Sequence, residues 1–226
     1  MDGFDLGSTD RLLTTTRAVR KRLDLTAPVE ESVVLECLRI ATQAPSGGNG
    51  QRWRWLLVRD RSARATIAGF YRQSYEAYSA PRRGLVPADD RSGQRIVDSS
   101  DFLAEHLAEV PLLVIPCVLD RLGPGATLQE SASLYGGILP AVWSFQLALR
   151  SRGYGSAFTT LHLVHEGEVG ELLGIPETVT QVALLPVARY TGQTFRPAPR
   201  RRIEELTYYD QWRRTAADVA ALDSQH

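Results

Sequence analysis

The segment APSGGNGQRW, residues 44–53, brings together the residue types best suited to hold a flat, polar ligand. Glycine lets a backbone approach such a ligand closely, and the carboxamides of Asn49 and Gln51 can donate and accept hydrogen bonds at its edge. An ordinary helix-to-strand turn needs fewer glycines than the three found here. Because no GK[ST] follows and no strand precedes it, the segment fits neither a phosphate loop nor a dinucleotide GxGxxG pattern. We therefore expect a ligand-contacting loop of another kind.

Two clusters of arginine could bind an anion. The first, TTTRAVRKR, lies at the end of a predicted helix over 8–22, and the second is Arg200–Arg202. A solvated basic end is common at a helix C-terminus because cations suit the helix dipole there. Arg17 and Arg20, three residues apart on a helix, would also share a face and could grip one phosphate together. Both interpretations stay open on the sequence alone.

The sequence lacks the residue patterns that let side chains catalyse a reaction without a cofactor. His162 and His165 are three apart, but no carboxylate or third ligand joins them in a zinc spacing, so no metal site is expected. A hydrogen-bonded or exposed histidine is the commoner situation. There is no GxSxG elbow and no Cys–His nucleophile pattern. No catalytic side chain is therefore predicted, and an enzyme of this sequence would take its reactive atom from a cofactor.

Composition limits the classes of partner. The chain has 226 residues with 26 acidic and 26 basic side chains, so no net field draws it to nucleic acid or to an acidic membrane. Cys37 and Cys117 lie in apolar runs, as buried thiols in a reducing compartment do. No export signal is visible, and no apolar stretch approaches the length needed to span a bilayer. A soluble, cytoplasmic protein is expected.

Periodicity predicts one domain, 1–226, of mixed α and β structure, in which helices outnumber strands. About four strands should form a central sheet covered by helices, although periodicity does not give the strand order. A buried helix over 133–151 should be the longest, and 120–131 should be loop. The predicted elements are helices over 8–22, 30–43, 61–80, 94–109, 133–151 and 165–173, and strands over 52–60, 111–120, 155–164 and 180–190.

Four stretches in order, TRAVRKR, APSGGNGQRW, RGYGS and ELLGIPETVTQVALLPVARY leading to PAPRRRIEEL, resemble the nitroreductase family of FMN-dependent oxidoreductases. The similarity covers about residues 12–206, which would form the core of the domain, with 207–226 as a C-terminal extension, and it looks closest to the actinobacterial branch. It implies an α+β fold with a mostly antiparallel sheet flanked by helices, in an intertwined homodimer with an extended C-terminal segment. Two FMN sites would lie at the interface, each built from both chains. NAD(P)H would reduce the flavin, and a nitroaromatic or quinone-type acceptor would then take its place.

Carried over residue by residue, the resemblance gives three groups of FMN contacts and one weaker pair. Arginines at both ends of the chain would bind the phosphate, a loop from the other subunit would reach the flavin, and a third group would pack near the reactive edge of the ring. Ala18 stands where the family usually has serine, and Arg52 replaces a proline, so both change the pocket. The implied contacts are Arg17, Ala18, Arg20 and Arg200; Pro45, Ser46, Asn49 and Gln51; Thr159, Thr160 and Leu161; and, more weakly, Gly137 and Ile138.

The acceptor side is less defined. The candidate substrate pocket consists of Phe70, Tyr71, Tyr75 and Phe158. A lid over a flat acceptor could be formed by Phe70, Tyr71, Tyr75 and Tyr78 with the polar segment 80–93. Aromatic residues at helical spacing belong more often to a core. The same scaffold could also perform another flavin reaction, such as dehydrogenation, dehalogenation or flavin breakdown, or bind flavin without catalysis. No residue selects among these activities.

Overall fold

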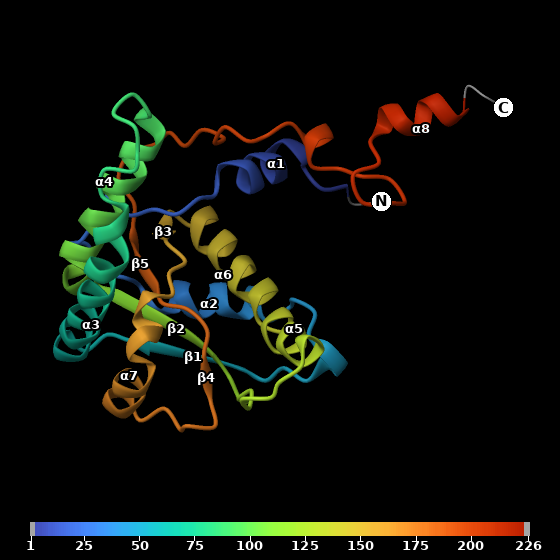
Figure 1. The fold of residues 1–226 in the computed structure, drawn as a ribbon. Helices are drawn as coiled ribbons and strands as arrows, with labels where there is room; N and C mark the ends of the chain where they lie inside the picture. The colour runs from blue at the N-terminus through green and yellow to red at the C-terminus, as the bar shows by residue number, and fades with distance from the viewer. Residues whose placement is uncertain (1–2, 224–226) are drawn as a thin grey trace. The chain divides into compact units, whose positions relative to one another are not determined.

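Five strands form one antiparallel sheet at the centre of the computed structural model, which describes residues 3–223 (Figure 1). The order is β1-β2-β5-β3, and β4 pairs with β2 at one end. Every strand pair is antiparallel and helices flank the sheet, which confirms the predicted α+β fold. The strands are β1 Trp53–Val58, β2 Leu112–Val118, β3 Tyr154–Ser156, β4 Thr180–Gln181 and β5 Leu185–Arg189.

The central strand β2 is buried along its whole length, as its continuous apolar sequence predicts. Its residues 112–114 pair with β5 and residues 117–118 pair with β4. Pro116, which has no N–H to donate, lies between these two pairings and accepts a hydrogen bond from Val182. The predicted strand over 180–190 is therefore wrong in one respect: it is divided into two short strands opposite this proline.

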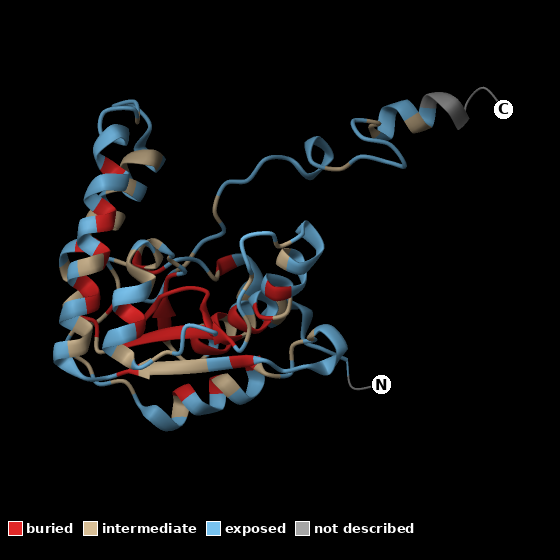
Figure 2. Cartoon of the chain, turned by 60° about the horizontal axis from the view of Figure 1, so that its bottom comes forward, coloured by how far each residue is buried: buried red, intermediate tan, exposed pale blue. Residues whose placement is uncertain are grey.

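Two layers of helices cover the sheet (Figures 1 and 2). α2 (Glu31–Ala41) and α6 (Leu139–Ser151) pack on each other and share a core cluster with alternate residues of β2. The intervening residues of β2 point the other way, as strand geometry requires. α3 (Arg61–Ser79), α4 (Arg91–His106) and α7 (Glu166–Leu173) complete the helical cover. Cys37 and Cys117 are buried free thiols, and burial raises their pKa values to about 11 and 12.

The first predicted helix is wrong beyond residue 15. α1 spans Leu6–Thr15, and Asp5 caps it by accepting a hydrogen bond from the Ser8 N–H. After it the chain becomes extended, because the Val19 N–H donates to the Ser156 carbonyl at 2.8 Å and Leu23 forms a β-bridge with Tyr190. These bonds to the sheet replace the helical ones that the local sequence favours.

The predicted single helix over 133–151 is also wrong, as is the loop predicted up to residue 131. Thr127 and Glu130 form a capping box that starts α5 (Leu128–Gly136), and a break at Gly137 and Ile138 separates α5 from α6. Pro140 fits the first turn of α6 because the N–H it lacks would have no helical partner there. The longest helix among residues 3–223 is instead α3, with 19 residues. The predicted strand over 155–164 is reduced to β3, and Leu161–His165 form a 3₁₀ turn.

The helices α5 and α6 are partly exposed, contrary to the prediction of a buried helix. Tyr135, Leu139 and Trp143 are 41%, 39% and 43% exposed. By length and composition, Leu128–Ser151 is the one apolar helical stretch in the described part of the chain that could cross a membrane, which corrects the expectation that none approaches that length. Since 44% of the most apolar 18-residue segment of this stretch is buried inside the protein, the stretch also fits a core helix.

The chain divides into two compact units, Met1–Thr194 and Phe195–His226. The second unit contains a 3₁₀ turn, Ile203–Glu205, and α8 (Ala216–Asp223). Within it the rings of Tyr208 and Trp212 meet edge to face, with centroids 5.1 Å apart. The sheet and all the helices around it belong to the first unit.

Candidate functional site

The loop of residues 44–52, called the glycine loop below, has an unusual backbone. Gly48, Asn49 and Gln51 have φ values of 56°, 51° and 46°. Glycine adopts this left-handed region freely and asparagine tolerates it, but a glutamine there costs about 1–2 kcal/mol. Strain of this kind persists where the surrounding contacts hold it, and it concentrates at functional sites.

Hydrogen bonds within the glycine loop hold this conformation. The Gln51 N–H donates to Ser46 Oγ at 3.2 Å, and Gln51 Nε2 donates to Asn49 Oδ1 at 3.1 Å. The Asn49 N–H donates to the Ser46 carbonyl at 2.9 Å. Both carboxamides are exposed and retain further donor and acceptor capacity for a ligand. The loop is therefore shaped in advance and still presents polar groups outward.

The glycine loop forms one wall of a cavity of about 740 Å³. The opposite wall is the α5–α6 junction, including Ser133, Gly137 and Ile138. A Cβ added at Gly47 would lie 3.9 Å from Ser133 Oγ, so the two walls come close at this point. Cavities of about 300–1,000 Å³ are typical of sites for small organic ligands and cofactors.

Two ion pairs lie beside this cavity. Arg52 Nη1 and Asp120 Oδ2 are 2.6 Å apart, which ties the glycine loop to the segment after β2. Arg121 binds Glu166 through two hydrogen bonds of 3.1 and 2.8 Å. Burial by itself raises the pKa of Glu166, but the hydrogen bonds and charge of Arg121 outweigh it and hold that pKa below its ordinary value. The charge introduced by Arg52 is thus compensated by Asp120.

The segment bearing Arg17 and Arg20 lies along β3 rather than on a helix. A Cβ added at Gly155 would come within 2.9 Å of the Val19 side chain, so the missing side chain permits this close approach. Arg17 and Ala18 are exposed, and Arg20 is half-buried. The shared helical face predicted for Arg17 and Arg20 is therefore wrong, because the backbone between them is extended.

Arg20 has the features of an anion-binding side chain. Its Nη1 lies 3.5 Å from the hydroxyl of Ser99 on α4, at the limit of hydrogen bonding. Within residues 3–223, no carboxylate lies at ion-pair distance from its guanidinium. A half-buried guanidinium with one weak neutral partner retains most of its donors for a phosphate.

Thr159 connects to the same neighbourhood through Tyr71. The Thr159 hydroxyl lies 3.2 Å from the Tyr71 hydroxyl, and the Thr159 backbone pairs with Leu184 in a β-bridge. Burial raises the pKa of Tyr71, and this rise is partly opposed by the hydrogen bond from Thr159 and the charge of Arg20. Thr160 is exposed, and Leu161 begins the following 3₁₀ turn.

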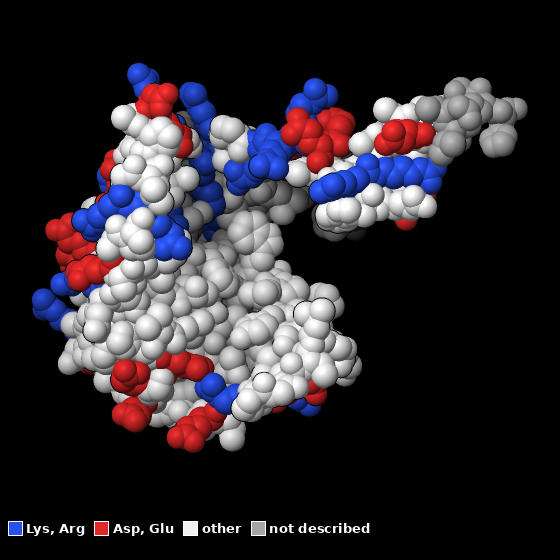
Figure 3. Space-filling model, in the orientation of Figure 1, with Lys and Arg blue, Asp and Glu red and all other residues white. Residues whose placement is uncertain are grey.

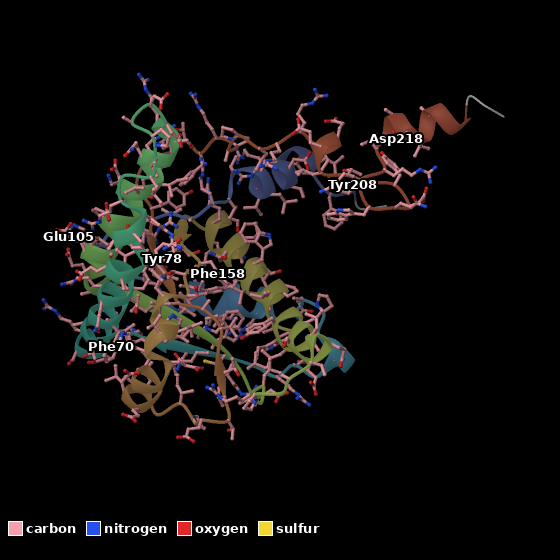
Figure 4. All side chains as sticks on the ribbon, viewed as in Figure 1. Phe70, Tyr78, Glu105, Phe158, Tyr208 and Asp218 are labelled. Atoms are coloured by element: carbon pink, nitrogen blue, oxygen red, sulfur yellow. The ribbon has the colours of Figure 1, made fainter. Side chains whose placement is uncertain are left out.

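The four aromatic residues of the predicted substrate pocket are divided between core and surface. Tyr71 and Tyr75 are only 4% and 7% exposed, and the Tyr75 hydroxyl is 2.8 Å from Asp101 of α4. The ring of Phe70 stacks on His165 with centroids 5.0 Å apart. Phe158 is 41% exposed, and the middle of the first unit, where Figure 4 labels it, has a mostly uncharged surface in the same view of Figure 3.

The predicted site residues thus form two groups within the first unit. Ser46, Gln51, Gly137 and Ile138 line the cavity, with Pro45 and Asn49 in the same loop. Arg17, Ala18 and Arg20, with Thr159, Thr160 and Leu161, do not line that cavity; Arg20 and Thr159 both lie near Tyr71. Arg200 belongs to the second unit.

Sequence reasoning missed the environment of His162. This histidine is completely buried, and neither ring nitrogen has a hydrogen-bond partner among the described residues. Burial lowers its pKa to about 4, and the nearby charge of Glu166 opposes the shift only in part. The expectation of a hydrogen-bonded or exposed histidine is therefore wrong. The surrounding sequence, LHLVH, carries no signal that distinguishes His162 from the half-buried His165.

Comparison with protein families gives a match over most of the chain. The model of the nitroreductase family matches residues 13–189, which include the glycine loop and the Thr159 segment. Among curated proteins, the chain is 28% identical over 138 residues to 5,6-dimethylbenzimidazole synthase of Rhodospirillum rubrum. This match covers 59% of the chain, and it spans about three fifths (61%) of the relative's length.

Solved structures with the same fold include enzymes described by different reactions. An iodotyrosine deiodinase bound to FMN and 3-iodo-L-tyrosine superposes with a TM-score of 0.69 at 21% identity, covering 90% of this chain and 99% of the other. A BluB-like flavoprotein from Clostridium difficile 630 gives 0.66 at 16% identity, covering 92% and 100%. A nitroreductase-like family protein from Bacillus cereus gives 0.63 at 17% identity, covering 93% and 100%. At these identities the likeness establishes the fold alone.

Proposed function

Because the chain belongs to the nitroreductase family, we propose that it is an FMN-dependent oxidoreductase that passes two electrons from NAD(P)H to a nitroaromatic or quinone-type acceptor. Bound FMN would supply the redox chemistry, taking a hydride from NAD(P)H and giving it to the acceptor. The observation that carries the proposal is the preformed glycine loop facing a cavity of about 740 Å³ inside the family match.

The residues present fit FMN in charge and in hydrogen-bonding chemistry. Arg20, half-buried and without a carboxylate partner among the described residues, would bind the phosphate together with Arg17. The role of Arg200, which belongs to the second unit, stays a prediction. Asn49 and Gln51 would bond the polar edge of the flavin ring, and Pro45 and Ser46 would flank it. Ala18 offers no hydroxyl to the phosphate, a loss of about 1 kcal/mol that charged contacts can offset.

We propose a homodimer with an FMN site at its interface. Tyr135, Leu139 and Trp143 expose apolar surface along α5 and α6, and exposed apolar patches commonly mark contacts between chains. Gly137 and Ile138, which line the cavity, lie in the break between these two helices. A second copy docked on this face would cover the cavity. The glycine loop would then contact the flavin whose phosphate is held by the other chain.

Replacing Trp143 with glutamate tests this interface. The charge would be desolvated at the contact, so the variant should shift from dimer to monomer in sedimentation equilibrium and lose FMN. Glutamate at Leu172, which is 40% exposed on α7, is a matched control that should leave the dimer intact. A monomeric wild-type protein that binds FMN fully would contradict an interface site.

The acceptor would bind on the mostly uncharged surface at Phe158. A neutral surface with an exposed aromatic ring suits a flat aromatic compound better than a strongly charged surface does (Figure 3). Tyr71 and Tyr75 would support this surface from the core instead of stacking directly on the acceptor, since both are buried. A cytoplasmic location, where NAD(P)H is available, belongs to the same proposal.

A second candidate function is a different flavin reaction on the same scaffold. The alternatives to nitro or quinone reduction are flavin breakdown, dehalogenation and dehydrogenation. They are favoured by the similarity to 5,6-dimethylbenzimidazole synthase and by the fold shared with iodotyrosine deiodinase. A flavin-binding dimer without catalysis is the remaining alternative. Product analysis separates these functions: loss of the flavin itself, release of halide, or reduced acceptor.

The first experiment is the visible absorbance spectrum of the purified protein, followed by anaerobic addition of NADH or NADPH. The proposal predicts flavin bands that bleach with one of the two nucleotides and return when a quinone is added. Bands that persist with both nucleotides would indicate another electron donor or a storage role. Absence of flavin even after addition of FMN would overturn the proposal.

The proposed contact of Gln51 with the flavin ring has its own test. Gln51→Ala should change the reduction potential of the bound flavin, and an unchanged potential would remove Gln51 from the ring contacts.

A further inference from the structure

The turn at Gln51 is held by weak bonds inside the glycine loop. Gln51 has a φ of 46°, a backbone conformation that is strained for a glutamine. Its N–H donates to Ser46 Oγ at 3.2 Å, and its side-chain amide donates to Asn49 Oδ1 at 3.1 Å. Both are long, neutral hydrogen bonds at the surface, where water competes for the same groups. A strained turn with these bonds alone would open readily, so a further contact has to hold it.

Arg52, the next residue, joins the glycine loop to the segment that follows β2. The Leu119 N–H donates to the Arg52 carbonyl at 2.8 Å, which extends the pairing of β1 with β2 by one hydrogen bond. The Arg52 guanidinium also forms an ion pair with Asp120, with Nη1 2.6 Å from Oδ2. A Cβ added at Gly50 would lie 3.8 Å from Arg52 Cγ and 3.9 Å from Arg52 Nε, so the side chain runs back along the loop. Arg52 thus links Gly50, on the other side of Gln51, to Asp120.

Asp120 is a fixed partner for this ion pair. Its N–H donates to the Val118 carbonyl at 2.7 Å, and its carbonyl accepts a hydrogen bond from the Thr180 hydroxyl at 2.6 Å. Its Oδ1 accepts a hydrogen bond from the Arg121 N–H at 2.9 Å, which leaves Oδ2 for Arg52. Because the carboxylate is already held in place, the entropic cost of the pair comes mainly from ordering the Arg52 side chain.

An ion pair at this position acts on the loop more than on the whole fold. The Arg52 and Asp120 side chains are 63% and 46% exposed, and exposed ion pairs add little to the stability of an entire protein. Opening the glycine loop, however, breaks only a few hydrogen bonds. A small contribution is therefore a large share of what keeps the loop closed.

We propose that Arg52 and Asp120 are positioning residues whose ion pair, called the latch below, holds the strained glycine loop in the shape that lines the cavity. The latch raises the fraction of molecules that can bind a ligand there. Neither side chain has to touch the ligand, because the apparent Kd rises whenever the competent fraction falls. The identity of the ligand rests on the proposed function, in which it is FMN, whereas the latch is a property of the flavin-free protein.

The first test measures opening of the loop without a ligand. NMR gives the solvent-exchange rates of the Asn49, Gly50 and Gln51 amide hydrogens, each of which is hydrogen-bonded within the loop. Asp120→Asn and Arg52→Gln should each raise these rates about two- to fivefold, the effect expected from losing one exposed ion pair. The double variant should show no further increase, and Arg52→Lys should keep most of the protection because it keeps the charge. The free energy of unfolding should stay close to that of the wild type in all four.

Salt gives a second test on the unmodified chain. Raising the ionic strength from about 0.05 M to about 1 M screens an exposed pair, so the exchange rates of the wild-type loop should rise toward those of Asp120→Asn. The rates of the variant should respond little to salt. Glu30→Gln is the matched control, because it breaks a comparably exposed ion pair, with Arg189, outside the glycine loop. It should leave the exchange rates of the loop unchanged.

Binding of FMN distinguishes the latch from a direct effect of the two charges. A latch predicts that Asp120→Asn and Arg52→Gln both raise the Kd of FMN, by no more than the fold-change seen in amide exchange. If the charges acted directly on the anionic cofactor, loss of Arg52 would weaken binding and loss of Asp120 would strengthen it. Effects of opposite sign, or Kd values unchanged in both variants, would overturn the inference.

The exchange measurements can also overturn the latch by themselves. Rates that stay the same in Asp120→Asn, or that rise equally in Glu30→Gln, would mean that the ion pair does not hold the loop. Failure of the wild type to bind FMN would instead reject the proposed function, and amide exchange would still decide whether the latch exists.

Discussion

Replacing Arg20 with alanine should weaken binding of FMN selectively over riboflavin. Arg20 is half-buried on the extended segment beside β3, and its described contact is a 3.5 Å approach to the Ser99 hydroxyl. Since that contact is weak and no carboxylate lies at ion-pair distance within residues 3–223, its removal should cost the folded protein little. What the variant loses is the charge offered to a phosphate, a group that FMN has and riboflavin lacks.

The expected magnitude follows from the hydrogen bonds that a half-buried guanidinium makes to an anion. Bonds to charged groups contribute about 1.5–3 kcal/mol, which corresponds to a roughly 10- to 150-fold increase in the dissociation constant of FMN. Riboflavin should bind the variant and the wild type within about twofold, because this charge-assisted bond does not form with it. The ratio of the two affinities isolates the phosphate contact from any general change in the site.

Flavin fluorescence titrations of the apoprotein with both ligands give this ratio. Arg61→Ala is the control for the loss of one positive charge, because Arg61 is exposed at the start of α3 and outside the proposed site. Equal weakening of both ligands by Arg20→Ala would mean that Arg20 supports the fold or the ring pocket. FMN binding within threefold of the wild type would refute the phosphate assignment altogether.

Three further predictions concern the segments that shape the site. Gly155→Ala should lower the free energy of unfolding and weaken FMN binding, because its Cβ would lie 2.9 Å from Val19, and adding Val19→Ala should restore part of both. Gly48→Ala should cost about 1 kcal/mol of stability in urea unfolding because its φ is 56°, whereas Gly47→Ala should be nearly neutral. Lowering the pH from 6.5 to about 4 should cost up to about 3 kcal/mol through His162, because the unfolded chain binds a proton that the folded protein, with a pKa of about 4, does not. Urea unfolding at several pH values checks this, and His162→Leu should flatten the dependence.

Each of these predictions can fail clearly. Additive losses from Gly155→Ala and Val19→Ala would mean that the close approach does not determine the path of the segment. Equal costs at Gly47 and Gly48 would mean that backbone strain is not the cause. A pH dependence equal in His162→Leu and in the wild type would assign the acid sensitivity to carboxylates instead.

The local sequence predicts most elements well. The apolar run of β2, the α3 helix capped by Asp60, and the ending of α7 at Gly174 all follow from periodicity, capping and glycine conformation, which act over a few residues. The glycine loop is also recognisable, since three glycines and two carboxamides have few other uses between a helix and a strand. The family follows from the order of its motifs.

The failures share one cause, which is bonding between segments far apart in the chain. The end of α1 depends on the hydrogen bond from Val19 to Ser156, 137 residues away (156 − 19), and no local pattern reveals it. The split of the predicted strand over 180–190 depends on Pro116 in a neighbouring strand. The break between α5 and α6 did have local signals in Gly136, Gly137 and Pro140, but continuous apolar character masked them.

The sequence by itself determined which functional groups are present, namely an arginine-rich segment and a glycine-rich polar loop without a recognisable nucleophile or metal-ligand pattern. It also determined the family. Only the tertiary structure decided which of these residues meet. It buried Tyr71 against Thr159, left Arg20 half-buried without a carboxylate among the described residues, and faced the glycine loop with the α5–α6 break. Side-chain types are local properties, whereas burial and partnership arise only when sheet pairing brings distant segments together, so the latter could not be derived from spacing.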